Sequence, residues 1–216
     1  MLEQILFIPV LIFSVVVHEC AHGIAAYRAG DPTAKAMGRI TLNPIPHIDL
    51  IGSVLLPALL IISHASFLFG WAKPVPVNPA NFRHPREDEI KVSFAGPASN
   101  LLLSLAFLVL TIALILVFKV FQLPAGSFRL YYTVLRGGMI INLVLAFFNL
   151  IPIPPLDGSH ILENMLPYEY ARYFQAMRPY GFIILLIVIM TPLISIAFWP
   201  VQIVMGIYQH ILQLFF

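Results

Sequence analysis

Five residues, His18-Glu19-Cys20-Ala21-His22, decide how this chain folds and what chemistry it can carry. They lie inside a long apolar segment, residues 2–29, that is predicted to be a helix. On a helix His18 and His22 are four residues apart and share one face, so two imidazoles can bind one zinc ion. Glu19 lies about 100° further round the helix, within reach of a water on that metal.

The composition places this helix in a membrane. Of the 216 residues, 60% are hydrophobic and only 10% are charged, whereas a soluble domain has about 25% charged residues. Ionisable side chains are costly in lipid and usually mark a functional site there, although two core histidines bonded to backbone would be the simpler alternative. The net charge of +2 gives no indication of nucleic-acid binding, and the single cysteine excludes an internal disulfide.

Further apolar runs follow along the chain, and they predict an all-α polytopic membrane protein with about four to six transmembrane helices. These runs are residues 94–121, 137–152, 181–198 and 200–216, with a loop expected at 123–135. We expect residues 1–216 to form a single membrane-embedded domain. The stretch Met37–Leu42 is predicted to be a small membrane-associated β element, closed by Asn43-Pro44.

A catalytic zinc site needs a third protein ligand and an open position for water. Asp157 and His160 lie at the end of another apolar segment. Asp157 is favoured, because the proline-broken stretch before it would hold it rigidly. His160 and His64 stay as alternative ligands, with His160 otherwise an interfacial residue or a hydrogen-bond partner of the site.

Three motifs together resemble the site-2 protease family of intramembrane zinc metalloproteases. They are His18-Glu19-Cys20-Ala21-His22, then Gly96-Pro97-Ala98-Ser99-Asn100, and last Asn149-Leu150-Ile151-Pro152-Ile153-Pro154-Pro155-Leu156-Asp157-Gly158. The second is similar to the family's G-x-x-x-N motif and the third to its N-x-x-P-x-x-x-L-D-G motif. The likeness extends from about Ile8 to Pro167, in a short form without a PDZ or CBS domain.

The resemblance implies one zinc ion per chain, with Asp157 as the third ligand and Glu19 as the general base. It also implies that Asn149 holds the substrate or its oxyanion. Gly96 and Asn100 are expected to support the site through close helix packing. The expected reaction is hydrolysis of a peptide bond in or near the transmembrane segment of a membrane protein.

Three ligands that bind one metal must lie at one depth in the bilayer. The helix of residues 2–29 and the apolar segment that precedes Asp157 must therefore cross in the same direction, with one crossing, residues 94–121, between them. Residues 50–72 should then be re-entrant, which agrees with their short apolar run and with Pro57.

The distribution of positive charge predicts that the site opens towards the cytosol, because lysine and arginine gather on the cytoplasmic side. In that orientation nine positive residues are cytoplasmic: Arg28, Lys35, Arg39, Lys73, Arg83, Arg86, Lys91, Arg172 and Arg178. Three fall outside: Lys119, Arg129 and Arg136. A prokaryotic plasma membrane suits such a short chain.

Two alternatives stay open at this point. One is a different class of membrane metalloprotease that uses a glutamate, Glu163 or Glu169, as the third ligand. The other is a membrane metal-binding protein or metal transporter without proteolytic activity. The sequence leaves the oligomeric state, the substrate and the membrane crossing of residues 200–216 open.

Overall fold

The computed structural model describes residues 2–55, 59, 62–63 and 71–216, and all regular structure within them is helical. The helices are α1 (Leu2–Ala29), α2 (Thr33–Ala36), α4 (Pro85–Phe121), α5 (Ala125–Asn149), α6 (Asp157–Met165), α7 (Tyr168–Met177), α8 (Gly181–Met190) and α9 (Leu193–Gln213). Single 3-10 turns occur at Ile45–His47, Pro79–Asn81 and Arg178–Tyr180, and a π-helical turn at Leu50–Leu55.

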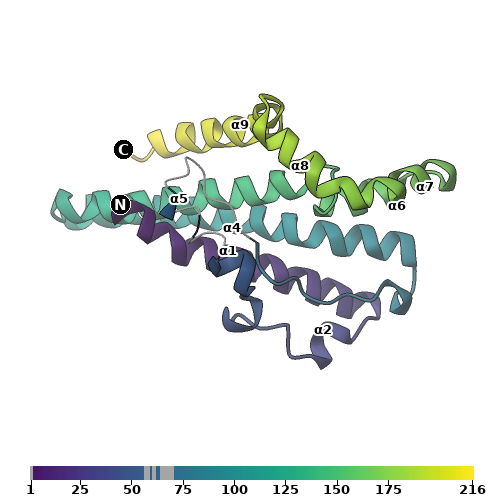
Figure 1. Cartoon of the computed structure of the whole chain (residues 1–216). Coiled ribbons are helices and arrows are strands. Elements are labelled where there is room, and N and C mark those ends of the chain that lie inside the picture. The colour runs from purple at the N-terminus through teal and green to yellow at the C-terminus, as the bar shows by residue number, and fades with distance from the viewer. Residues whose placement is uncertain (1, 56–58, 60–61, 64–70) are drawn as a thin grey trace.

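Helices α1, α4 and α5 form the centre of the molecule and lie side by side, with α4 antiparallel to the other two (Figure 1). Helix α9 packs against α4 and α5 through a cluster of buried apolar side chains. Its members are Leu108, Ile115, Met139, Leu143, Val201, Met205, Tyr208 and Leu212. The parallel course of α1 and α5 is the arrangement that a shared ligand depth requires.

Five segments of the described chain are long and apolar enough to cross a membrane: 6–29, 85–121, 126–149, 168–190 and 193–213. The prediction of an all-α polytopic membrane protein is therefore confirmed. The last of these segments includes residues 200–213 of the apolar run expected at 200–216. Both termini lie at the same end of the bundle (Figure 1). Lys119, at the end of α4, lies 3.4 Å from the carbonyl oxygen of Phe215, which agrees with that placement of the C-terminus.

The turn after α1 is organised by a completely buried carboxylate, Asp31. Gly30 ends the helix with a φ of +114°, a conformation that suits glycine. One oxygen of Asp31 then accepts the backbone N–H of Asn78 at 2.7 Å, and the other accepts the side-chain amide of Asn81 at 2.7 Å. Asp31 thus joins the end of α1 to residues 78–81, the stretch just before α4.

The β element predicted at Met37–Leu42 is wrong. These residues form turns and bends, and no strand occurs in the part of the chain that the structure describes. The backbone N–H of Gly38 donates to the carbonyl of Lys35, and that of Arg39 to the carbonyl of Ala34. Because these bonds fold the segment back onto α2, its backbone does not extend, and no neighbouring strand is described with which it could form a ladder.

Two other expectations have different outcomes. The loop expected at residues 123–135 is wrong, because α5 already begins at Ala125. The re-entrant course expected for residues 50–72 falls largely outside the described residues, since 56–58, 60–61 and 64–70 are not described. It stays a prediction.

Asp31 makes a testable contribution to stability. Burial raises the pKa of its carboxyl, but hydrogen bonds from Asn78, Thr33 and Asn81 outweigh burial and leave the pKa below its ordinary value. An Asp31→Asn variant should unfold more easily by about 1–3 kcal/mol at pH 7, because buried donors lose their acceptor. Thermal unfolding in detergent micelles measures this loss.

The pH dependence of that difference gives the check. A carboxyl with a lowered folded-state pKa stabilises fully above its unfolded value, about pH 4, and this stabilisation is lost as the pH falls through the folded-state pKa. The gap between wild type and Asp31→Asn should therefore narrow in acid. A gap that stays constant with pH would contradict the assignment. Glu169→Gln, at an exposed position, serves as the control.

Candidate metal centre

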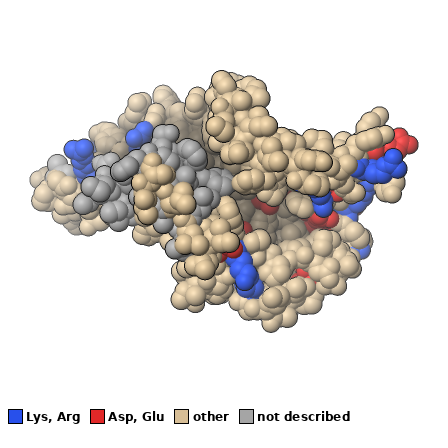
Figure 2. Space-filling view, viewed as in Figure 1, with Lys and Arg blue, Asp and Glu red and all other residues tan. Residues whose placement is uncertain are grey.

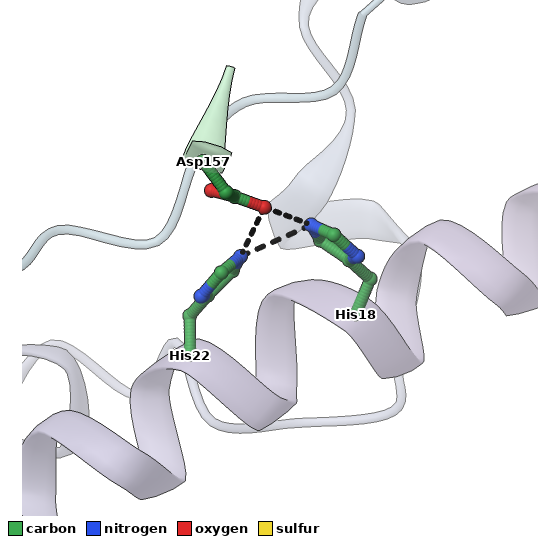
Figure 3. A group of neighbouring side chains, drawn as sticks. All are labelled: His18, His22 and Asp157. Atoms are coloured by element: carbon green, nitrogen blue, oxygen red, sulfur yellow. Dashed lines mark hydrogen bonds and ion pairs between the residues drawn. The ribbon is translucent and has the colours of Figure 1, made fainter. Parts of the chain in front are cut away.

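Three side chains from two distant parts of the sequence meet at one point: His18 and His22 of α1, and Asp157 at the first position of α6. The two imidazoles lie on the same face of α1 and point towards the carboxylate (Figure 3). The Nε2 atoms of the histidines are 3.0 Å apart. Oδ2 of Asp157 lies 3.2 Å from Nε2 of His18 and 3.3 Å from Nε2 of His22.

The turn between α5 and α6 brings Asp157 to α1. Helix α5 ends at Asn149, and residues 150–156 form a tight connection that includes a cis peptide bond between Pro154 and Pro155. Gly158 packs directly against the backbone of Leu150, where a Cβ atom would overlap the carbonyl group. A glycine at this position therefore lets α6 begin close to the end of α5, with Asp157 facing α1.

The hydrogen bonds on the far side of the imidazoles decide which nitrogen faces the centre. Nδ1 of His22 lies 2.7 Å from the carbonyl oxygen of Val92, which can only accept, so Nδ1 carries the hydrogen. Nδ1 of His18 lies 2.6 Å from Oδ1 of Asn100, whose Nδ2 donates to the carbonyl of Ser14. Both Nε2 atoms of the neutral imidazoles therefore direct lone pairs inwards.

The three atoms that face the centre are therefore all electron-pair donors, and none of them carries a hydrogen. Oδ2 of Asp157 is buried and accepts no hydrogen bond from the described part of the chain. Three converging lone pairs repel one another unless a cation lies between them.

Zinc fits this donor set. Zinc binds histidine nitrogen and carboxylate oxygen at roughly 2.0–2.2 Å in tetrahedral geometry, so neighbouring ligand atoms lie about 3.3 Å apart. The separations of 3.0, 3.2 and 3.3 Å among the three ligand atoms are close to that value. A zinc ion held by these three residues would keep one position for water or substrate.

Gly96 of α4 provides the room for this arrangement. A Cβ atom at position 96 would lie 2.6 Å from Nε2 of His18, and it would approach Nε2 of His22 still more closely. The backbone of α4 therefore forms the floor of the centre. The structure places Gly96 and Asn100, one turn apart on α4, at the two histidines. The supporting role expected of them stays a prediction.

The centre opens into a cavity of about 750 Å³. Glu19 and Asn149 line this cavity together with His18, His22 and Asp157. Oε2 of Glu19 accepts the backbone N–H of Val75 at 2.7 Å, and Nδ2 of Asn149 donates to the carbonyl of Leu145 at 2.9 Å. Figure 2 shows the molecule hollowed on this side, with acidic side chains inside the hollow.

The alternative ligands lie apart from the centre or are not described. His160 lines the same cavity, but its Nδ1 lies 3.3 Å from the carboxylate of Glu89. Glu163 is itself buried, and its Oε2 forms an ion pair at 2.6 Å with the partly exposed Arg178. His64 lies outside the described residues.

Two completely buried residues next to Asn100, Ser14 and Asn142, belong to no motif quoted above. Their signal in the sequence is a polar residue within an apolar run, and that signal does not reveal what the residue contacts. Their partners lie on other helices, and only the folded structure shows them.

A family profile and several known proteins match this chain. The profile of Peptidase family M50 matches residues 117–188, which include Asn149 and Asp157. "Putative zinc metalloprotease YwhC" of Bacillus subtilis is 41% identical over 88% of this chain and 82% of its own length. "Putative zinc metalloprotease Rip2" of Mycolicibacterium smegmatis is 30% identical over 88% of this chain and 69% of its own length.

A more distant archaeal relative also matches. "Zinc metalloprotease MJ0392" of Methanocaldococcus jannaschii is 28% identical over 77% of this chain and 35% of its own length. No solved structure gives a significant match. With YwhC similar over most of both chains, and with a helical, membrane-compatible fold, this chain belongs to Peptidase family M50, the zinc-dependent site-2 protease family.

Proposed function

We propose that residues 1–216 act as one membrane-embedded protease domain that hydrolyses a peptide bond in or near the transmembrane segment of a membrane protein. One zinc ion would be held by His18, His22 and Asp157. The observation that carries this proposal is the convergence of three lone-pair atoms, 3.0–3.3 Å apart, beside a glutamate in one cavity. Together with membership of a zinc-dependent family, this supports proteolysis over simple metal storage.

Glu19 is the proposed general base. When bound, zinc supplies a Lewis acid that polarises a carbonyl and makes water more acidic. The Glu19 carboxylate takes a proton from the attacking water and delivers it to the leaving amine. Its hydrogen bond from Val75 supports this role, because it orients the carboxylate and still leaves oxygen lone pairs for a proton.

Asn149 is the proposed donor to the oxyanion. Its side-chain amide has two hydrogens, and one of them is donated to Leu145 within α5. The second is free of that bond and belongs to a side chain that lines the cavity. A donor fixed by its own helix needs no reorganisation during the reaction, which is what stabilises developing negative charge.

The substrate must reach the centre with its backbone unwound, because a helix conceals its carbonyls in i to i−4 hydrogen bonds. The cavity has apolar walls from several elements, which suit side chains that come from lipid. They include Trp71, Val75, Val77, Leu145, Phe148, Phe182 and Leu185. A single-span membrane protein is the proposed substrate, and the bilayer is the proposed surrounding.

The proposed orientation opens the centre towards the cytosol of a cell membrane, in line with the nine-to-three distribution of lysine and arginine. Both termini lie at one end of the bundle (Figure 1), and His18, His22 and Asp157 lie in or beyond the C-terminal halves of α1 and α5, so the proposed opening is on the side away from the termini. A cytosolic opening would supply the water that hydrolysis consumes.

The role of Glu19 as a base is tested by replacing its carboxylate with an amide. A Glu19→Gln variant should keep one zinc per chain and lose about 10²–10⁴-fold in cleavage of a single-span substrate in proteoliposomes, because glutamine cannot take the proton. Zinc is counted by elemental mass spectrometry in the same samples. Glu169→Gln, an exposed glutamate, should cleave like wild type. Equal cleavage by Glu19→Gln and wild type would refute the mechanism.

The close approach of Gly96 to both histidines is tested by adding a Cβ atom at this position. A Gly96→Ala variant should lose at least tenfold in zinc affinity, because its Cβ would displace both histidines. Competition with a chromogenic chelator measures the affinity. The matched control is Gly206→Ala in α9, where an added Cβ meets no atom within 4 Å. Unchanged zinc affinity in Gly96→Ala would show that the histidines do not hold the ion.

The orientation of the chain in the membrane is tested by labelling of single cysteines. In a Cys20→Ala background without other cysteines, Lys35→Cys and Arg129→Cys place a thiol at exposed positions near opposite ends of the bundle. A membrane-impermeant maleimide should label position 129 in intact cells and position 35 only in inverted vesicles. The reverse pattern would place the centre on the outer side.

A further inference from the structure

A line of buried polar side chains crosses the centre of the bundle, from α1 through α5 to α4. Ser14, Asn142 and Asn100 are all completely buried in it. Polar groups removed from water inside apolar helices are costly unless every one is hydrogen-bonded. Their partners therefore determine how each amide and hydroxyl is oriented.

The orientation can be read from the backbone carbonyls at one end, because a carbonyl can only accept. The hydroxyl of Ser14 donates to the carbonyl of Val10 at 2.7 Å. Nδ2 of Asn142 donates to the carbonyl of Gly138 and to Oγ of Ser14, each at 2.9 Å. Both hydrogens of the Asn142 amide are thereby used, and its Oδ1 can only accept.

The next amide in the line is fixed by this acceptor. Nδ2 of Asn100 donates to Oδ1 of Asn142 at 2.9 Å and to the carbonyl of Ser14 at 3.2 Å. Its Oδ1 is left to accept from Nδ1 of His18 at 2.6 Å. The hydrogen on His18 must therefore be at Nδ1, and the lone pair at Nε2 faces Asp157.

Rotation of the Asn100 amide by 180° would reverse this outcome. It would direct an N–H at Nδ1 of His18, which would move the ring hydrogen to Nε2 and remove the lone pair from the centre. With Asn142 in place, that rotation would also set the Asn100 oxygen against two acceptors, Oδ1 of Asn142 and the carbonyl of Ser14. Without Asn142, the carbonyl of Ser14 alone still opposes the rotation.

His22 needs no such device, because its Nδ1 faces the backbone carbonyl of Val92 directly. The two histidines are thus held in the same tautomer by different means. For His18 a side-chain amide takes the place of a carbonyl, and an amide has two possible orientations. A second residue must then select one of them.

We propose that Asn142 is a positioning residue of the metal centre: through Asn100 it keeps Nε2 of His18 free of hydrogen and directed at the ion. The proposal rests on the proposed role of His18 as a zinc ligand. Asn142 touches neither the ion nor the substrate. Its effect passes through one hydrogen bond to Asn100.

The test is the zinc dissociation constant of the full chain in detergent, measured by chelator competition. Asn142→Leu, close in size and without hydrogen bonds, should raise the constant about tenfold, as expected for residues that orient a metal ligand. The matched control is Ser104→Ala, which removes another buried hydrogen bond between α4 and α5, to the carbonyl of Met139. It should leave zinc affinity unchanged.

A double-variant cycle separates positioning from a general packing defect. Because Asn142 acts through Asn100, Asn100→Leu together with Asn142→Leu should bind zinc as weakly as Asn100→Leu alone. Effects that multiply in the double variant, or an Asn142→Leu affinity equal to wild type, would overturn the proposal. If Asn142→Leu does not fold, Asn142→Ala, which removes the same acceptor without adding a larger apolar group, decides: weaker zinc binding supports the proposal and unchanged binding overturns it.

The same measurements keep this proposal apart from the proposed function. Wild-type chain that binds no zinc, or zinc affinity that His18→Ala leaves unchanged, would remove the metal centre itself. Zinc binding that depends on His18 but not on Asn142 would overturn only the positioning role.

Discussion

Three lone pairs meet inside a bundle of apolar helices, and the rest of the structure follows from the need to keep them there. His18 and His22 lie on α1, and Asp157 lies beyond the end of α5. Bringing them within 3.3 Å requires α1 and α5 to run in the same direction, with α4 antiparallel beside them (Figure 1). The geometry of the three side chains therefore also fixes the relative directions of the helices that carry them.

Helix α4 links that geometry to the outer hydrogen bonds of the histidines. It provides Gly96 against the imidazole rings, the carbonyl of Val92 for His22 and the amide of Asn100 for His18. A side chain at 96 would push the rings apart, whereas a missing acceptor would leave their tautomers undecided. Helix α4 therefore acts on His18 and His22 in two ways: its backbone packs closely against their rings, and it supplies the acceptors for their Nδ1 hydrogens.

The segment before α4 is hydrogen-bonded to α1 and to the turn that follows α1. Asp31 binds Asn78 and Asn81 just after the helix ends, and Glu19 binds the amide of Val75 in the middle of the helix face. Prolines at 74, 76 and 79 have no N–H to donate, so few amides in this stretch need partners. One wall of the cavity is thereby fixed to the helix that carries the histidines and the proposed base.

The sequence by itself determined the helical membrane fold, the face of α1 that carries both histidines, the preference for Asp157 and the parallel course of α1 and α5. Those conclusions rest on local periodicity, on the cost of charge in lipid and on the shared depth of ligands. Only the tertiary structure decided the rest: Met37–Leu42 folds back onto α2, α5 begins at Ala125, and Ser14 and Asn142 join Asn100 behind His18. The physical reason is that a hydrogen bond between helices depends on which faces meet, and no local pattern encodes that.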